Sequence, residues 1–189
     1  IESKIKPSDI GPVDYVLLTH EHSDHFYPEA LNEFLAMRPL EFITHQRLAG
    51  LIKEKNINAP IHILAAAEQK TFGPFTIKAI TAPHGAIPSI APENLAFLIN
   101  NKLFHPGDSL DFIIEPGVEI LALPVAAPWL TVVTALDAGT KFKPKTIIPI
   151  HDAIIKDFML ERIYRMAKNK LEVSGIKFQP LTLGQALDA

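Results

Sequence analysis

The segment that most limits what this chain can fold into is Thr-His-Glu-His-Ser-Asp-His at residues 19–25. It follows a short apolar run, residues 13–18, whose β-branched and aromatic side chains predict a buried strand. At the end of that strand His20 and His22 point the same way, because side chains alternate with period two, whereas Asp24 and His25 fall on the turn. Imidazole and carboxylate are preferred donors for divalent cations, so we expect this loop to serve two neighbouring metal ions.

Three later segments also place a histidine or an aspartate at the end of an expected strand, and they contribute His84, Asp108 and His151. Sites in layered α/β proteins form at strand ends, so we expect these side chains to join the first loop. Taken alone, each of them would more often be a hydrogen-bonded residue of the core or of a loop. Gly85 and Gly107, which adjoin two of them, would let metal or substrate approach the backbone closely.

Two ligand sets can be written from these side chains. One ion would be held by His20, His22 and His84, and the other by Asp24, His25 and His151, with Asp108 bridging the two. Each ion would keep a position for water, which is typical of catalytic rather than structural metal sites.

Several residues near these donors have two open interpretations. His105 is either a hydrogen-bond donor behind a ligand or an ordinary strand histidine. Thr19 and Asp152 either orient neighbouring imidazoles or serve as capping or solvent-facing groups. Aromatic side chains, among them Phe26 and Trp129, either line a substrate pocket or belong to the core.

Composition restricts the class of protein. The 189 residues, 48% apolar and 21% charged, fit one globular domain over residues 1–189. A net charge of −3 gives no field that would gather nucleic acid or anionic lipid, and the absence of cysteine leaves imidazole and carboxylate to hold metal. The longest uncharged stretch, residues 120–136, is too short and too rich in proline to span a bilayer. We therefore expect a cytoplasmic protein with a small-molecule substrate and no nucleic-acid or membrane partner; the oligomeric state stays open.

The hydrophobic pattern predicts alternating strands and helices, followed by more strands. We expect a βαβα unit first, antiparallel sheet over residues 61–80 and another hairpin over residues 95–105, and this mixture indicates an α/β layered domain with two sheets inside the helices. Strands are expected at 13–18, 41–44, 61–64, 70–72, 75–80, 95–100, 102–105, 118–123, 146–150 and, at a sheet edge, 176–181. Helices are expected at 27–37, 46–55, 129–141 and 158–170.

The order of His-x-His-x-Asp-His, an isolated His, Gly-Asp and a final His resembles the metallo-β-lactamase superfamily. Leu-Leu-Thr-His-Glu-His-Ser-Asp-His, His-Pro-Gly-Asp-Ser and Ile-Ile-Pro-Ile-His resemble its branch of small bacterial metal-dependent hydrolases, akin to ascorbate-phosphate lactonases. The resemblance covers nearly the whole chain. It implies a four-layer αββα sandwich, here without the usual first N-terminal strands, and the same ligand roles for two divalent metal ions. Zinc is the expected ion, and manganese or iron would suit the same donors.

The resemblance implies a hydrolase in which a dinuclear metal-activated hydroxide attacks a small ester, lactone or phosphoester. Asp24 is the expected catalytic residue, which orients the hydroxide and passes its proton to the leaving group. Relatives carry a polar, glycine-containing loop where this chain has the apolar residues 125–130, which we expect to wall the pocket. One alternative is a non-catalytic metal-binding or scaffold domain. Another is a nuclease, which is disfavoured because no basic arm or aromatic-basic platform is present.

Overall fold

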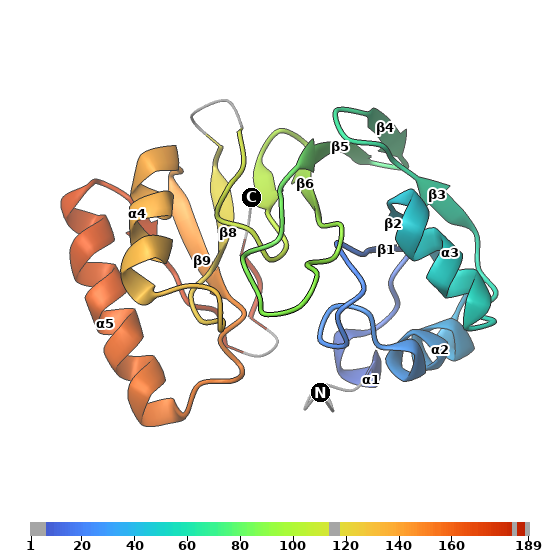
Figure 1. Ribbon diagram of the computed structural model, residues 1–189, viewed down its shortest axis with the longest axis horizontal. Coiled ribbons are helices and arrows are strands. Elements are labelled where there is room, and N and C mark those ends of the chain that lie inside the picture. Colours follow the sequence, from blue (N-terminus) through green and yellow to red (C-terminus); the bar gives the residue numbers. More distant parts are fainter. Residues whose placement is uncertain (1–6, 114–117, 183–184, 188–189) are drawn as a thin grey trace.

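The first part of the chain forms a parallel three-stranded sheet covered by two helices (Figure 1). The computed structural model describes residues 7–113, 118–182 and 185–187. After a short helix α1 (Pro7–Ile10), the order is β1 (Tyr15–Leu17), α2 (Pro28–Met37), β2 (Glu41–Thr44), α3 (Gln46–Glu54) and β3 (Ile61–Ile63). Strand β2 lies between β1 and β3 and pairs with both in parallel.

Strand β3 corrects the expectation that residues 61–80 form antiparallel sheet throughout. It pairs in parallel with β2, so that Ile43 lies opposite His62. The reason is helix α3, which carries the chain back to the end of the sheet at which β2 begins, as in other crossover connections between parallel strands. The predicted βαβα unit is therefore extended by one more strand.

The remaining strands form a mixed seven-stranded sheet with the order β10-β9-β8-β7-β6-β5-β4. The antiparallel part contains β4 (Gln69–Phe72), β5 (Phe75–Thr81), β6 (Leu95–Ile99) and β7 (Leu103–His105). The parallel part adds β8 (Ile120–Pro124), β9 (Thr146–Ile150) and β10 (Lys177–Phe178). The helices α4 (Val132–Phe142) and α5 (Asp157–Val173) connect its members. The two-residue strand β10 lies at the edge, as predicted, where Pro180 interrupts no ladder.

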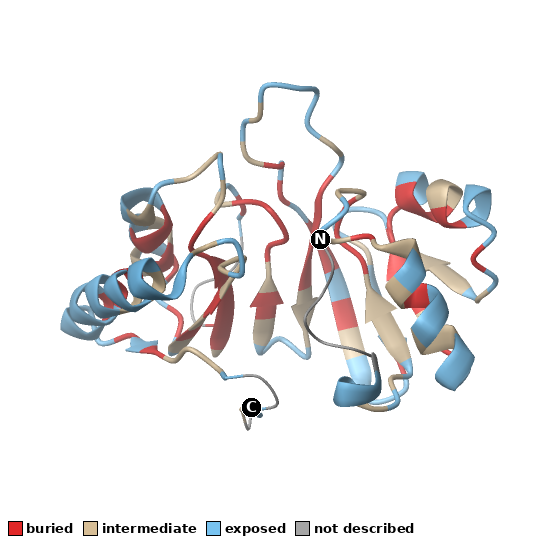
Figure 2. Ribbon diagram, turned by 90° about the horizontal axis from the view of Figure 1, so that it is seen from below, coloured by how far each residue is buried: buried red, intermediate tan, exposed pale blue. Residues whose placement is uncertain are grey.

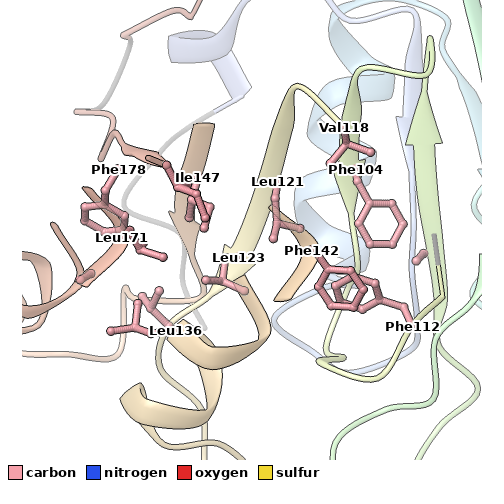
Figure 3. Close-up of a cluster of buried hydrophobic side chains, with 14 of the residues drawn as sticks. Phe104, Phe112, Val118, Leu121, Leu123, Leu136, Phe142, Ile147, Leu171 and Phe178 are labelled. Atoms are coloured by element: carbon pink, nitrogen blue, oxygen red, sulfur yellow. The ribbon is translucent and has the colours of Figure 1, made fainter. Parts of the chain in front are cut away.

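Three buried clusters give the molecule four layers, helices–sheet–sheet–helices. One cluster packs α2 and α3 on the small sheet, a second joins the two sheets, and the third packs α4 and α5 on the large sheet (Figure 3). Strand β6 follows the period of two, because Leu95 and Phe97 face the small sheet while Ala96 and Leu98 face the third cluster. Figure 2 shows that buried residues are concentrated in several of the strands and the inner sides of the helices, whereas the outer helix faces are exposed. The four-layer αββα sandwich is confirmed.

The apolar pattern predicts that helix α4 begins at Trp129. In the structure it begins at Val132. Thr131 is the N-cap residue: its side chain accepts a hydrogen bond from the Thr134 N–H, and the Thr134 hydroxyl accepts one from the Thr131 N–H. This capping box fixes the start of the helix and leaves Trp129 on the preceding loop.

The other predicted elements agree with the structure to within a few residues at their ends. None of the helices in the described part of the chain combines the length and apolar character needed to cross a bilayer.

The third cluster predicts a strong dependence of stability on Leu121, which is fully buried in β8. We expect Leu121→Ala to lower the free energy of unfolding by about 2–5 kcal/mol, because the lost apolar contacts are accompanied by a cavity. Urea unfolding followed by circular dichroism measures this change. Val173→Ala is the matched control, since Val173 is 89% exposed and its truncation should change little. Equal effects of the two substitutions would contradict the packing described here.

Candidate metal centre

The side chains expected to bind metal come together where strands of both sheets end. His20 follows β1, His84 follows β5, Asp108 follows β7 and His151 follows β9. In Figure 1 the loops after these strands meet near the middle of the molecule, between the two helical layers. Their donor atoms form two groups, each with all its atoms within 4.8 Å of one another: His20, His22, His84 and Asp108, and then Asp24, His25 and His151.

In the first group three imidazole nitrogens face a common point. His22 Nδ1 lies 3.2 Å from His20 Nε2 and 3.2 Å from His84 Nε2. Ligands of one tetrahedral zinc ion, at 2.0–2.1 Å from the metal, lie roughly 3.3 Å apart. The spacing of these nitrogens is therefore that of ligands around one ion.

In the second group carboxylates and imidazoles alternate. His151 Nε2 lies 3.3 Å from Asp24 Oδ2 and 3.3 Å from Asp108 Oδ2. Asp108 Oδ1 lies 3.1 Å from His25 Nε2, and Asp108 Oδ2 lies 3.5 Å from His84 Nε2. The Asp108 carboxylate thus touches both groups, which is the position that a bridging ligand would need.

The rings of four histidines are held by contacts at Nδ1. His84 Nδ1 donates to Gly85 O at 2.7 Å, and His151 Nδ1 donates to Ala126 O at 2.6 Å. Thr19 Oγ1 lies 3.0 Å from His20 Nδ1 and 3.4 Å from His25 Nδ1. A hydrogen bond at Nδ1 fixes the tautomer and leaves the lone pair of Nε2 for a metal ion. Of the two open interpretations of Thr19, contact with the imidazoles is the one observed.

His151, Asp24 and Asp108 shift one another's pKa values. Asp108 and Asp24 raise the pKa of His151 to about 10, and His151 in turn lowers the pKa of Asp24 to about 2. Burial alone would favour a neutral Asp108, yet His151 and His25 hold its pKa below the ordinary value. The two carboxylates therefore favour the positively charged form of the His151 imidazole.

The first group behaves differently, because burial dominates there. Burial, together with His25, lowers the pKa of His20 to about 3, and burial and His84 lower the pKa of His22. These imidazoles are neutral at neutral pH, the form that binds metal.

Two buried polar atoms test whether the residues fit metal ions. In the described part of the chain, Asp108 Oδ1 and His151 Nε2 are buried without a hydrogen-bond partner, although charged neighbours lie close by. Buried polar atoms are almost always paired, so unpaired atoms that point at neighbouring donors fit ligands of an ion. The donor set of imidazole and carboxylate fits divalent metals as well.

A residue that the sequence did not single out, Asn94, ties the loops together. Its side-chain amide donates to Ala82 O at 2.7 Å and to Pro106 O at 2.9 Å, and its Oδ1 accepts from the Asp108 N–H at 3.2 Å. Gly107 makes room for it: φ is +60° there, and a Cβ would lie 2.2 Å from Asn94 Oδ1. A lone asparagine after a proline-rich loop carries no signal by which sequence reasoning could have found it.

Trp129 also lies at the centre. Its indole N–H donates to Asp108 Oδ2 at 3.3 Å, and its ring centroid lies 5.9 Å from that of His84. A Cβ at Gly85 would lie 2.2 Å from the indole, so the ring packs directly on this glycine. Of the two open interpretations of Trp129, a place beside the site is the one observed.

The other neighbouring residues have structural contacts. Phe26 is buried in the cluster between α2, α3 and the small sheet. The Gly107 N–H donates to His105 Nδ1, so this histidine supports the turn before Asp108. Asp152 accepts a hydrogen bond from the Tyr164 hydroxyl, which joins the loop after His151 to helix α5.

An αββα sandwich with imidazole and carboxylate donors at its strand ends defines the metallo-β-lactamase class of fold. The sequence profile described as Beta-lactamase superfamily domain matches residues 3–151, and the chain belongs to this family, in the branch of small metal-dependent hydrolases.

Individual proteins and one solved structure are similar to this chain, the latter in its fold. The chain is 30% identical over 148 residues to Protein Rv0786c of Mycobacterium tuberculosis, a match that covers 74% of this chain and 67% of that protein. It is 28% identical over 157 residues to a UPF0173 metal-dependent hydrolase of Natranaerobius thermophilus, which covers 79% of this chain and 69% of that protein. Among solved structures, the metallo hydrolase Igni18 of Ignicoccus hospitalis superposes with a TM-score of 0.65 at 17% identity, over 92% of this chain and 78% of that one.

The contacts of Asn94 predict an effect on metal affinity. Asn94→Ala should weaken binding of zinc by about 10–100-fold, as the loss of groups that orient ligands typically does, because the Asp108 loop loses its brace. Competition with a chromogenic chelator measures the affinity. Asn169→Ala, on an exposed face of α5, is the matched control. An Asn94 variant that is folded and binds zinc as tightly as the wild type would show that the brace is dispensable.

Proposed function

We propose that this chain is a metal-dependent hydrolase with a dinuclear centre that acts on a small ester, lactone or phosphoester. The observation that carries the proposal is the pair of adjacent donor groups with the Asp108 carboxylate in contact with both. Membership of the family and the names of relatives as metal-dependent hydrolases support it.

Each group would hold one ion. His20, His22 and His84 would bind the first, Asp24, His25 and His151 the second, and Asp108 would bridge them. Two divalent cations bound there would lower the pKa of a water molecule from 15.7 to about 7 and so supply a nucleophile near neutral pH. Zinc suits these donors best, and manganese or iron would also fit them.

Asp24 is the better suited of the two carboxylates to handle a proton. Its side chain is 30% exposed, whereas that of Asp108 is 4% exposed, so solvent and substrate can reach Asp24 alone of the pair. His151 keeps it ionised by lowering its pKa, and an ionised carboxylate can orient an attacking water and accept its proton. The carboxyl group would then return this proton to the leaving group.

The number of bound ions is the first prediction of the proposal. Elemental analysis of the purified, zinc-loaded protein should give two ions per chain, and His84→Ala and His25→Ala should each reduce the content to about one. His62→Ala is the matched control, because His62 pairs with Glu41 away from the centre. A wild-type protein that takes up no transition metal under any loading condition would end the proposal.

Asp24→Asn predicts a loss of turnover with metal retained. We expect kcat to fall by about 10²–10⁴, the usual contribution of a general acid or base, with a much smaller change in KM. Steady-state kinetics on a panel of lactones, esters and phosphodiesters, with metal content measured on the same samples, separates a loss of turnover from a loss of metal. Asp14→Asn, at an exposed ion pair with Arg38, is the control. Two bound ions in the wild type without turnover of any substrate would favour a metal-binding scaffold, and an unimpaired Asp24→Asn rate would remove Asp24 from the mechanism.

A further inference from the structure

The loops that carry the donors also carry apolar side chains that solvent reaches. Ile90, in the loop between His84 and Asn94, is 97% exposed, and Ile154, three residues after His151, is 51% exposed. Phe158, at the start of α5, is 68% exposed. Ligand pockets are lined mainly by apolar and aromatic side chains, so an apolar side chain that touches the donors is a candidate for contact with the substrate.

Trp129 is an apolar side chain that contacts the reacting centre directly. Its indole N–H donates a hydrogen bond to Asp108 Oδ2, and its ring lies on Gly85 beside His84. The residue is partly exposed. An indole so fixed presents a rigid apolar face next to the donors at little cost in side-chain entropy. A substrate group attached to the scissile bond would meet this face first.

Charge around the centre disfavours an anionic substrate. In the described loops 18–27, 82–94, 106–113, 125–131 and 151–156, Lys156 is the single lysine or arginine. The nearby Arg47 of α3 is 2.7 Å from Glu21 and already paired. Apart from Asp24 and Asp108, which would bind the ions, and Glu21, which pairs with Arg47, the same loops carry the carboxylates of Glu93, Asp111 and Asp152. A phosphate or carboxylate on the substrate, away from the metal ions, would therefore meet like charge and no arginine fork.

The geometry points to an uncharged substrate, an ester or lactone whose acyl part is apolar, with Trp129 as the residue that determines this specificity. The inference rests on the proposed hydrolase and narrows its substrate class, because it disfavours phosphoesters.

Matched esters test it. The zinc-loaded protein is assayed on 4-nitrophenyl acetate, butyrate and hexanoate and on the mono-4-nitrophenyl ester of adipic acid, which matches hexanoate in chain length and adds a distal carboxylate. We expect kcat/KM to rise at least tenfold from acetate to hexanoate and to fall at least tenfold from hexanoate to the adipate ester. Equal values across the series, or a preference for the adipate ester, would overturn the inference.

Trp129 variants assign the preference to this side chain. Trp129→Ala should abolish the dependence on chain length, mainly through KM for hexanoate, while Trp129→Phe should retain it because the ring stays. Phe75→Ala, which removes an exposed aromatic ring at the β4–β5 turn, is the control and should behave like the wild type. If the alanine variant does not fold, the phenylalanine variant still decides: loss of the chain-length dependence in a folded Trp129→Phe contradicts the role of the ring.

A binding measurement separates failure of this inference from failure of the proposed function. Trp129 is the single tryptophan of the chain, so intrinsic fluorescence reports on this position alone. Hexanamide should shift the emission to shorter wavelength, and adipic acid monoamide, which carries the distal carboxylate, should not. Absence of turnover with two bound ions would refute the hydrolase, and the fluorescence titration would then decide whether an apolar ligand binds. No shift with hexanamide would overturn the inference whatever the activity.

Discussion

Burying a carboxylate without compensation costs several kcal/mol, so the side chain of Asp108, 4% exposed, requires positive charge or N–H donors around it. The imidazoles of His25, His84 and His151 lie within 3.5 Å of its oxygens, and the indole of Trp129 donates to one of them. These partners come from loops of both halves of the chain. The contacts that compensate the buried Asp108 carboxylate therefore hold together loops that follow strands of both sheets.

The backbone supports this arrangement independently of the side chains that would bind metal. The Gly85 N–H donates to Asp108 O, the Leu95 N–H donates to Thr19 O, and the Val125 N–H donates to Ile150 O. Each bond joins two segments that lie beside the donors, so the backbone itself positions them. A site prepared in this way loses little freedom when an ion binds, which favours rigid coordination.

Much of this was predictable because strand ends have a strong local signal. The period of two predicts that His20 and His22, just after β1, point the same way, and the four layers follow from alternating strands and helices. Features that depend on contacts between distant parts of the chain, or on a local cap, leave no such signal in the hydrophobic pattern. The parallel pairing of β3 depends on the path of α3, the late start of α4 depends on the Thr131 capping box, and the role of Asn94 depends on carbonyls that only the folded loops bring near. That the converging donors bind metal stays a prediction.

The late start of α4 matters for chemistry as well as for the fold. Had the helix begun at Trp129, the indole would have followed the helical repeat; because Thr131 caps the helix, the loop carries the ring to Asp108 and Gly85. The same side chain then contacts a carboxylate of the centre and forms part of its apolar surroundings. A substitution at Trp129 should therefore change the electrostatics of the centre and the choice of substrate together, and the phenylalanine variant, which keeps the ring and removes the N–H, is the one that separates the two effects.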